Sequence, residues 1–260
     1  MLKKITPIIL TYNESPNICR TLDMLSWAID IVVVDSFSTD TTLELIKNYP
    51  QVRVLQRAFD THANQWDFAI KKTGVITEWV LALDADYVLT ESFVKELDNI
   101  DLNSGIEAYK ANFRYCVLGE ALSGSLYPPV TVLFNIKKAN YIQDGHTQRV
   151  KIDGNIGYFQ ALILHDDRKS LLTWLQAQHK YMRLEAALLS KKKWNKLRMA
   201  DKIRKLIFIA PIVTFFYCLF IKKGLIDGKV GLYYAIQRTS AEAILSLCIL
   251  ELHYIKKKEK

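Results

Sequence analysis

The sequence predicts an α/β protein with a mostly parallel β-sheet and helices on both faces of it, followed by an apolar and basic helical region. Over roughly the first third of the chain, short apolar runs alternate with segments of helical apolar spacing, the pattern of consecutive β-α-β units. The chain has 260 residues and half of them are hydrophobic, which is enough for one large domain with a sizeable core and an appendage.

Four apolar runs in the first part are predicted strands, and each is short and ends at polar residues. They cover residues 5–10, 31–34, 52–55 and 79–83. The segments between them are predicted helices, at residues 13–26, 40–49 and 64–72. Pro16 lies near the start of the first of these helices, where proline is tolerated.

The pattern changes after residue 86. We expect a short helix at residues 92–97, strands or strand-like pieces at 109–117, 130–135, 150–152 and 161–164, and a long helix at 170–193. We assign residues 1–200 to the α/β domain and residues 201–260 to a C-terminal, membrane-associated helical region.

The C-terminal region carries the basic charge of the chain. Residues 190–260 hold 16 Lys and Arg against 5 Asp and Glu, a net charge of +11, while the remainder has a net charge of −3. The basic residues flank apolar stretches and carry no interleaved aromatic pattern, so they favour an anionic membrane surface as partner over nucleic acid.

Two apolar segments lie within this region. Residues 206–221 are almost wholly apolar, but they are shorter than the ~18–20 residues of a spanning helix and are interrupted by Pro211. Residues 230–252 are more amphipathic. We therefore expect a peripheral or monotopic protein with a pair of interfacial or re-entrant helices, and a buried helical hairpin that covers the sheet is the alternative.

Cysteine use and the N-terminus indicate an intracellular chain. The four cysteines are widely scattered and form no Cys-x-x-Cys pair, which is typical of a reducing compartment. The apolar stretch after the basic N-terminus is short and contains Pro7, so it predicts a first strand rather than a signal peptide.

Asp84 and Asp86 directly follow the fourth predicted strand, with Ala85 between them. Two carboxylates one residue apart at the end of a buried strand suit a divalent cation such as Mg²⁺, which takes few protein ligands and completes its shell with water and phosphates. The ordinary alternative is that these aspartates make a turn or cap a helix.

Other polar groups follow other predicted strands. Thr11-Tyr12-Asn13-Glu14 follows the first strand, and Asp35-Ser36-Phe37-Ser38-Thr39-Asp40 follows the second. Because the carboxyl ends of parallel strands share one edge of a sheet, we expect these groups to converge with Asp84 and Asp86 on one crevice. Each group also has a structural explanation, as a helix start or a turn.

Two further polar groups lie later in the chain, at residues 144–149 and 165–168. Asp144 and Gly145 also have the composition of a tight turn. A lone His165 is commonly a core histidine with a satisfied ring, and Arg168 is commonly a solvated surface charge.

Together these groups resemble the inverting, family-two glycosyltransferases with the GT-A (nucleotide-diphospho-sugar transferase) fold. The resemblance covers roughly residues 5–169 and rests on the order and spacing of Thr11-Tyr12-Asn13-Glu14, Val33-Val34-Asp35-Ser36 and Asp84-Ala85-Asp86. Residues 144–149, 164–165 and 223–228 look like the branch that builds lipopolysaccharide core or other cell-envelope glycans.

The resemblance implies a role for each matching residue. Thr11, Tyr12 and Glu14 would line the nucleotide pocket, and Asp35 would bind the uracil ring of a UDP-sugar such as UDP-glucose. Asp84 would lie near the ribose or the sugar. Asp86 would hold Mg²⁺ or Mn²⁺ on the diphosphate, with His165 as a further metal ligand and Arg168 facing the phosphates.

Inversion also needs a base on the acceptor side. A carboxylate within reach of the acceptor hydroxyl suffices, and we assign the base to Asp144, with His146 as the alternative. Relatives often have Glu where this chain has Gln148, and a neutral amide is not a base. The chain also departs from the family at Phe37, where Gly is usual, and in the loop at residues 59–68, which lacks glycines but offers His62, Asn64 and Gln65.

The sequence thus predicts a metal-dependent, hexosyltransferase-type enzyme at the cytoplasmic face of the inner (plasma) membrane. Its partners would be a nucleotide-sugar and a lipid-linked or core-oligosaccharide acceptor. The alternatives are a non-catalytic scaffold or glycan-binding protein of the same fold, and a nucleotidyltransferase. The second of these is disfavoured because the loop after the first strand has neither Gly nor Arg or Lys.

Overall fold

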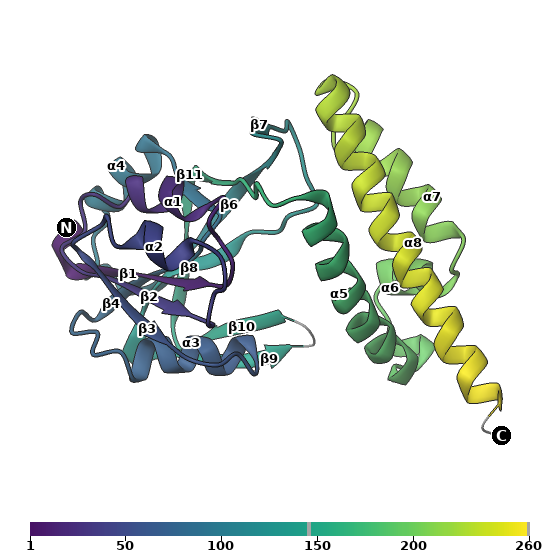
Figure 1. Cartoon of the computed structure of the whole chain (residues 1–260), viewed down its shortest axis with the longest axis horizontal. Coiled ribbons are helices and arrows are strands. Elements are labelled where there is room, and N and C mark those ends of the chain that lie inside the picture. The colour runs from purple at the N-terminus through teal and green to yellow at the C-terminus, as the bar shows by residue number, and fades with distance from the viewer. Residues whose placement is uncertain (145–146, 259–260) are drawn as a thin grey trace. The chain divides into compact units, whose positions relative to one another are not determined.

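The computed structural model describes residues 1–144 and 147–258, and side chains are described for residues 1–142, 149–255 and 258. The chain forms two compact units (Figure 1). The first consists of Met1–Gly119 and Tyr127–Arg168, and the second of Glu120–Leu126 and Lys169–Lys260. We describe each unit by itself.

The first unit contains a large mixed sheet with the strand order β3-β2-β1-β4-β8-β6-β11-β5. The strands are β1 (Ile5–Thr11), β2 (Ile31–Asp35), β3 (Val52–Gln56), β4 (Trp79–Asp84), β5 (Tyr87–Leu89), β6 (Ile106–Val117), β8 (Val130–Asn135) and β11 (Asn155–His165). Strands β1 to β4 are mutually parallel neighbours, and β8 joins them antiparallel. The predicted α/β class and the four N-terminal strands are confirmed.

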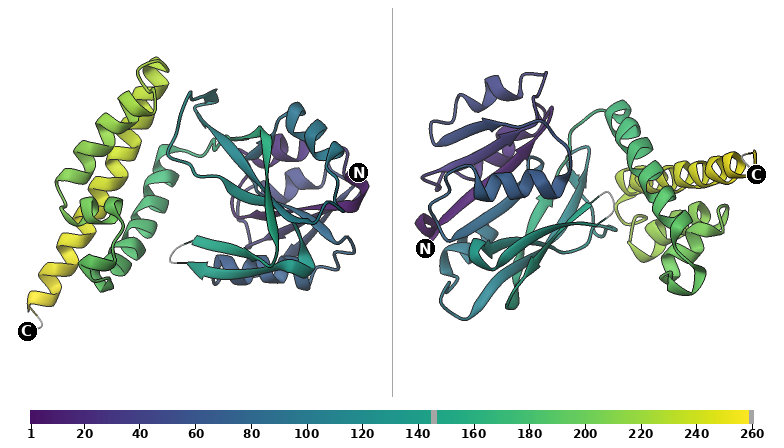
Figure 2. Two further views of the ribbon diagram at one scale, coloured as in Figure 1. Left: turned by 180° about the vertical axis from the view of Figure 1, so that it is seen from behind. Right: turned by 90° about the horizontal axis from the view of Figure 1, so that it is seen from below.

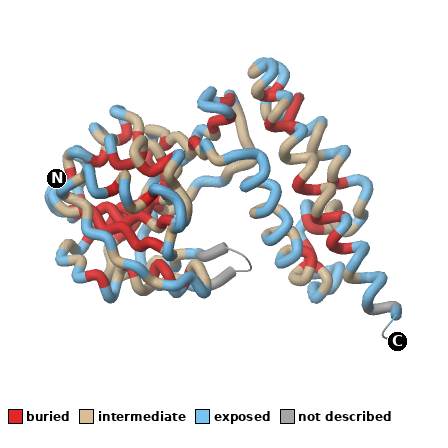
Figure 3. Tube along the Cα trace, viewed as in Figure 1, coloured by how far each residue is buried: buried red, intermediate tan, exposed pale blue. Residues whose placement is uncertain are grey.

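Both faces of this sheet are covered, because successive residues of the apolar strands point to opposite sides. On one face Ile9, Val33 and Leu81 pack with α1 (Ile18–Asp23), α2 (Thr42–Ile46) and α4 (Glu91–Asn99). On the other face Ile8, Val32 and Val80 pack with α3 (His62–Lys71). The core therefore lies on both sides of β1, β2 and β4, where Figure 3 shows the buried chain in red.

The predicted helix at residues 13–26 is wrong in its first turn. Asn13 has a φ of 53°, in the left-handed region, so the chain forms a loop before α1 begins at Ile18. Three consecutive backbone N–H groups of this loop donate to side chains from the loop after β2, namely Asn13 to Ser38, Glu14 to Thr42 and Ser15 to Asp40. These bonds hold the two loops together and replace the first helical turn.

A separate hairpin of β9 (Ala139–Asp144) and β10 (Thr147–Ile152) pairs antiparallel. Its Tyr141 ring stacks on Trp66 of α3, with ring centroids 5.5 Å apart. This contact fixes the hairpin beside the sheet face that α3 covers.

The second unit is helical. Its elements are α5 (Leu171–Lys191), α6 (Met199–Lys205), α7 (Ile209–Phe216), the π-helical segment η4 (Tyr217–Ile221) and α8 (Gly228–Lys258). Buried residues of α5 and α8, with Leu197, form its core. The functional boundary predicted between residues 200 and 201 stays a prediction.

An ion-pair cluster ties the helices of the second unit together. Arg204 on α6 makes hydrogen bonds to both carboxylate oxygens of Glu242 on α8, at 2.8–3.2 Å. Its guanidinium also lies 3.6 Å from Glu185 on α5.

Within the described chain, every helix is too short or too polar to cross a bilayer.

Candidate active site

The carboxyl ends of β1, β2 and β4 meet at one edge of the sheet, as the sequence predicts. Thr11 is in register with Asp35 on β2, and Leu10 is in register with Asp84 on β4. The loops that follow these strands therefore start side by side. Ligands of open α/β sheets bind at this edge.

Asp35 is wholly buried at the end of β2 and anchors the surrounding loops. Its carboxylate accepts hydrogen bonds from the Thr11 hydroxyl at 3.1 Å, from the Ser38 backbone N–H at 2.9 Å and from the Ser38 hydroxyl at 2.5 Å. The Gln56 amide donates to it at 3.1 Å. These four bonds give Asp35 a structural role in holding the loops, and its predicted contact with a uracil ring stays a prediction.

Tyr12 and Phe37 are large rings exposed on the loops around Asp35. Tyr12 is 55% exposed and Phe37 is 52% exposed. Phe37 has a φ of 61°, a conformation that favours glycine. This conformation explains why Gly is usual at this position in the family that the sequence resembles. The two rings border the place predicted for the nucleotide.

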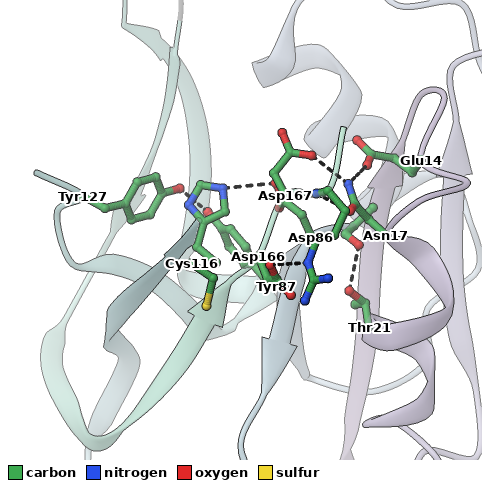
Figure 4. Close-up of polar contacts among 12 residues, drawn as sticks. Glu14, Asn17, Thr21, Asp86, Tyr87, Cys116, Tyr127, Asp166 and Asp167 are labelled. Carbon is green, nitrogen blue, oxygen red and sulfur yellow. Dashed lines mark hydrogen bonds and ion pairs between the residues drawn. The ribbon is translucent and has the colours of Figure 1, made fainter. Parts of the chain in front are cut away.

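Asn17 is a buried connector between two loops of the site (Figure 4). Its side-chain nitrogen donates to Glu14 Oε2 at 2.8 Å and to Asp167 Oδ1 at 3.0 Å. Its side-chain oxygen accepts from the Arg168 backbone N–H at 2.8 Å. The predicted nucleotide-pocket residue Glu14 is thereby linked to the segment that follows β11.

Asp86 and His165 meet across the sheet edge. Asp86 Oδ2 lies 3.1 Å from His165 Nε2, and each side chain is 14% exposed. The two are brought together because β5, which directly follows Asp86, pairs antiparallel with the end of β11, where Tyr87 is in register with His165. The backbone N–H of Asp166 also donates to the Asp86 carbonyl at 3.0 Å. The structure thus joins the two residues predicted to be metal ligands.

Three tyrosine rings surround the His165 imidazole edge-on, with centroids 5.4, 4.8 and 4.4 Å away for Tyr87, Tyr115 and Tyr127. The hydroxyl groups of Tyr87 and Tyr127 are hydrogen-bonded to each other (Figure 4). This packing fixes the orientation of the imidazole toward Asp86.

Asp84 and Asp86 make this pocket electronegative. Burial raises the pKa of Tyr87 and of Tyr127, and the Asp84 carboxylate raises the pKa of each further. Burial is the largest single influence on His165 and lowers its pKa, but the charge and hydrogen bond of Asp86, together with the charges of Asp84 and Asp167, leave the pKa of His165 raised. The site therefore favours a positive charge beside Asp84 and Asp86.

The residues present have the chemistry for a divalent cation but do not enclose one. In the described part of the chain, no group of three or more His, Cys, Asp or Glu side chains is placed to hold a metal. Asp86 and His165 supply an oxygen and a nitrogen ligand, and the buried Nδ1 of His165 has no hydrogen-bond partner among the described residues. This donor set fits a cation that takes its remaining ligands from a bound diphosphate and water.

Arg168, predicted to face the phosphates, is held by a carboxylate in this structure. Its Nε donates to Asp166 Oδ1 at 2.7 Å, and this bond raises the pKa of the guanidinium. The guanidinium lies against Gly119, where a Cβ would come within 2.4 Å of Nη2. Gly119 is thus required for this placement of Arg168, and the contact with phosphate stays a prediction.

Only one of the two candidate bases, Asp144, has a described backbone. Asp144 is the last residue of β9 and is in register with Thr147, and its side chain is outside the described part. His146 and Gly145 lie outside the described residues altogether. Their catalytic assignments stay predictions.

The sequence also singled out the loop at residues 59–68. Gln65 is buried and donates to the Ser36 hydroxyl at 3.1 Å, and it accepts from Arg57 at 2.5 Å. Asn64 donates to Asp60, and His62 packs edge-on against Phe59. Gln65 therefore links α3 to the loop after β2.

Arg57, Asn17 and Asp166 were not among the predicted site residues. Arg57 directly follows β3, and Asp35 is the last residue of β2. The place of Arg57 at the end of a predicted strand could therefore have identified it as a candidate site residue. Asn17 was not predicted as a site residue because residues 13–26 have the apolar spacing of a helix, and Asn17 would lie in the interior of that helix. Asp166 is adjacent to His165, but no motif or spacing in the sequence indicated a role for it.

The chain was compared with known proteins. It matches the sequence model for glycosyl transferase family 2 over residues 6–164. A glycosyltransferase of Rickettsia prowazekii is 31% identical over 111 residues, which are 42% of this chain and 37% of that protein. The SPbeta prophage-derived glycosyltransferase SunS of Bacillus subtilis is 34% identical over 86 residues, which are 32% of this chain and 20% of that protein. The alignments thus span well under half the length of either relative.

Among solved structures, residues 1–349 of TarS from S. aureus in complex with UDP-GlcNAc are similar with a TM-score of 0.48 and 16% identity, over 97% of this chain and 92% of that chain. The family model covers more than half of the chain, and its matched residues include β1 to β4 and nearly all of β11. The chain therefore belongs to glycosyl transferase family 2.

Proposed function

We propose that this chain is an inverting glycosyltransferase that moves a hexose from a UDP-sugar to a glycan acceptor. The observation that carries the proposal is the approach of Asp86 Oδ2 to His165 Nε2, 3.1 Å apart at the carboxyl edge of the sheet. Asp86 lies among the residues that the family's model matches and His165 directly follows the last of them, and the two side chains meet where α/β sheets bind ligands.

The donor would occupy the loops after β1, β2 and β4. Thr11, Tyr12 and Glu14 would line the nucleotide pocket around the Asp35 anchor, and the exposed Tyr12 ring offers a face on which a base can stack. Asp84 would orient the ribose or the sugar.

Asp86 and His165 would hold Mg²⁺ or Mn²⁺ at the diphosphate. Such a cation neutralises the negative charge that develops on a departing nucleoside diphosphate. The protein's part is to hold the carboxylate and the imidazole in place through the three tyrosines and the β5–β11 pairing. Arg168 would add positive charge near the phosphates if its guanidinium left Asp166 and bound the phosphates instead.

On the acceptor side, the hydroxyl oxygen attacks the anomeric carbon while the bond from that carbon to the diphosphate oxygen breaks. The hydroxyl proton passes to a base, and UDP leaves with the bonding electrons. We assign the base to Asp144, which ends β9 of a hairpin that packs beside the sheet, and His146 is the alternative from the sequence. A single displacement inverts the anomeric centre.

Two features of the sequence indicate the class of acceptor. Residues 144–149, 164–165 and 223–228 resemble the lipopolysaccharide-core or cell-envelope branch, and residues 190–260 carry a net charge of +11. A lipid-linked or core-oligosaccharide acceptor at the cytoplasmic face of the inner membrane accounts for both features.

A donor screen tests this function. Purified protein with a core-oligosaccharide or lipid-linked acceptor is supplied in turn with a panel of UDP-hexoses, and release of UDP is measured. We expect one donor to release UDP only in the presence of acceptor, and Asp144→Asn to bind that donor without transfer. If UDP binds but no donor on the panel is turned over, the non-catalytic alternative is favoured.

A further inference from the structure

The second unit exposes a continuous apolar face along α7 and η4. Its members recur every three or four residues, which places them on one side of the helical path. They are Ile209, Ile212, Val213, Phe216, Phe220 and Ile221, and all are exposed. We call this set the α7 face. Phe216 is 52% exposed and Phe220 is 59% exposed, and their rings are stacked with centroids 6.1 Å apart.

The opposite side of the same helical path is already buried. Ala210, Cys218 and Leu219 are covered, and α7 runs along α8 in both views of Figure 2. Gly224 and Gly231 let the turn after η4 approach α8, because a Cβ at Gly231 would lie 2.0 Å from the Gly224 carbonyl oxygen. The α7 face is therefore not the side of the helix that forms the core of this unit.

The charge around the α7 face is positive at both ends. Residues 206–221 contain no charged residue, Lys202 and Lys205 precede them, and Lys222 and Lys223 follow. The nearby acids Asp201 and Glu242 are buried and paired with Arg204, so they do not offset this charge at the surface. The pattern is an apolar strip with basic ends.

The length of the strip excludes a transmembrane path. The 8 residues of α7 and the 5 of η4 extend about 20 Å, and the hydrocarbon core of a bilayer is about 30 Å thick. Pro211 lies in the first turn of α7, where its missing N–H is tolerated. A helix of this length with an apolar side and basic ends lies in the plane of the interface.

We infer that the α7 face inserts into one leaflet of an anionic membrane, with its basic ends at the lipid headgroups. A second copy of the chain is a poorer occupant, because a two-fold antiparallel contact would bring Lys202 and Lys205 of one copy against Lys222 and Lys223 of the other. An anionic bilayer complements the apolar strip and both basic ends together. The inference rests on the second unit alone and not on the donor site.

Vesicle flotation of the full chain tests this inference. The vesicles are phosphatidylcholine alone or phosphatidylcholine with phosphatidylglycerol. We expect flotation with the anionic vesicles, and the double variant Phe216→Ser/Phe220→Ser should lower the partition coefficient about tenfold or more. The matched control is Ile29→Ser/Ile76→Ser, which removes two exposed apolar side chains from the first unit and should leave flotation unchanged.

A second pair of measurements separates insertion from the alternatives. Lys222→Gln/Lys223→Gln should weaken flotation at low salt, whereas the phenylalanine pair should still matter at high salt because apolar burial is not screened. Equal flotation of wild type and the phenylalanine variant would overturn the inference. A second result would also overturn it: the wild type does not float, sedimentation velocity shows a dimer, and the phenylalanine variant abolishes that dimer. This result would assign the α7 face to a second copy of the chain. Circular dichroism confirms that each variant is folded. Flotation without UDP binding would refute the donor site alone.

Discussion

Asn17 donates a hydrogen bond from its side-chain nitrogen to Asp167 Oδ1 at 3.0 Å, although the two residues are 150 positions apart in the chain. The same nitrogen donates to Glu14 Oε2 at 2.8 Å. A single buried amide therefore sets the distance between the loop after β1 and the segment after β11. The donor pocket proposed between these loops depends on that distance.

Replacing Asn17 by Ala should destabilise the first unit and weaken donor binding. The change removes the amide that pairs with the partly buried backbone N–H of Arg168 and with the carboxylates of Glu14 and Asp167. It should cost about 2–3 kcal/mol in the free energy of unfolding. Urea denaturation and UDP titration measure the two effects. Asn48→Ala, at an exposed position, is the control and should change neither.

Replacing Phe37 by Gly should stabilise the chain relative to Phe37→Ala. Both variants remove the exposed ring, but only Gly adopts a φ of 61° without strain, so Gly should be more stable than Ala by about 1 kcal/mol. Paired thermal melts of the two variants measure the difference. If Ala were as stable as Gly, the left-handed conformation assigned to this residue would be wrong.

Arg204 and Glu242 should show strong coupling in the second unit. Glu242→Leu removes the charge that faces a largely buried guanidinium and should cost about 3 kcal/mol. The double variant Arg204→Met/Glu242→Leu should recover most of that loss, since both charges leave together. A double-mutant cycle by urea denaturation measures the coupling, and additive effects of the two single changes would contradict it.

The sequence predicts the part of the site that depends on local pattern. Asp35 and Asp84 each close a continuous apolar run, so the parallel register that aligns them with Thr11 and Leu10 follows from the order of the strands. The loop at residues 13–17 was missed because its apolar spacing is helical, while its structure is set by side chains from the loop after β2.

The pairing of Asp86 with His165 could not be derived from local pattern. It depends on β5, a strand of three residues too short to recognise by alternation, and on its antiparallel pairing with β11. His165 was noted in the sequence as part of the polar group at residues 165–168, but its role as a metal ligand came from the family resemblance.

The affinity of the chain for UDP, measured by titration calorimetry with Mn²⁺ and with EDTA, tests the proposed donor site most directly. The wild type should bind more tightly with Mn²⁺, and Asp86→Asn should abolish the difference, because the amide keeps the shape of the side chain but lacks its charge. Asp153→Asn, at an exposed acid in the β10–β11 turn, is the matched control and should keep the difference. Equal affinity of the wild type with and without Mn²⁺, or an unchanged metal effect in Asp86→Asn, would contradict the assignment of Asp86.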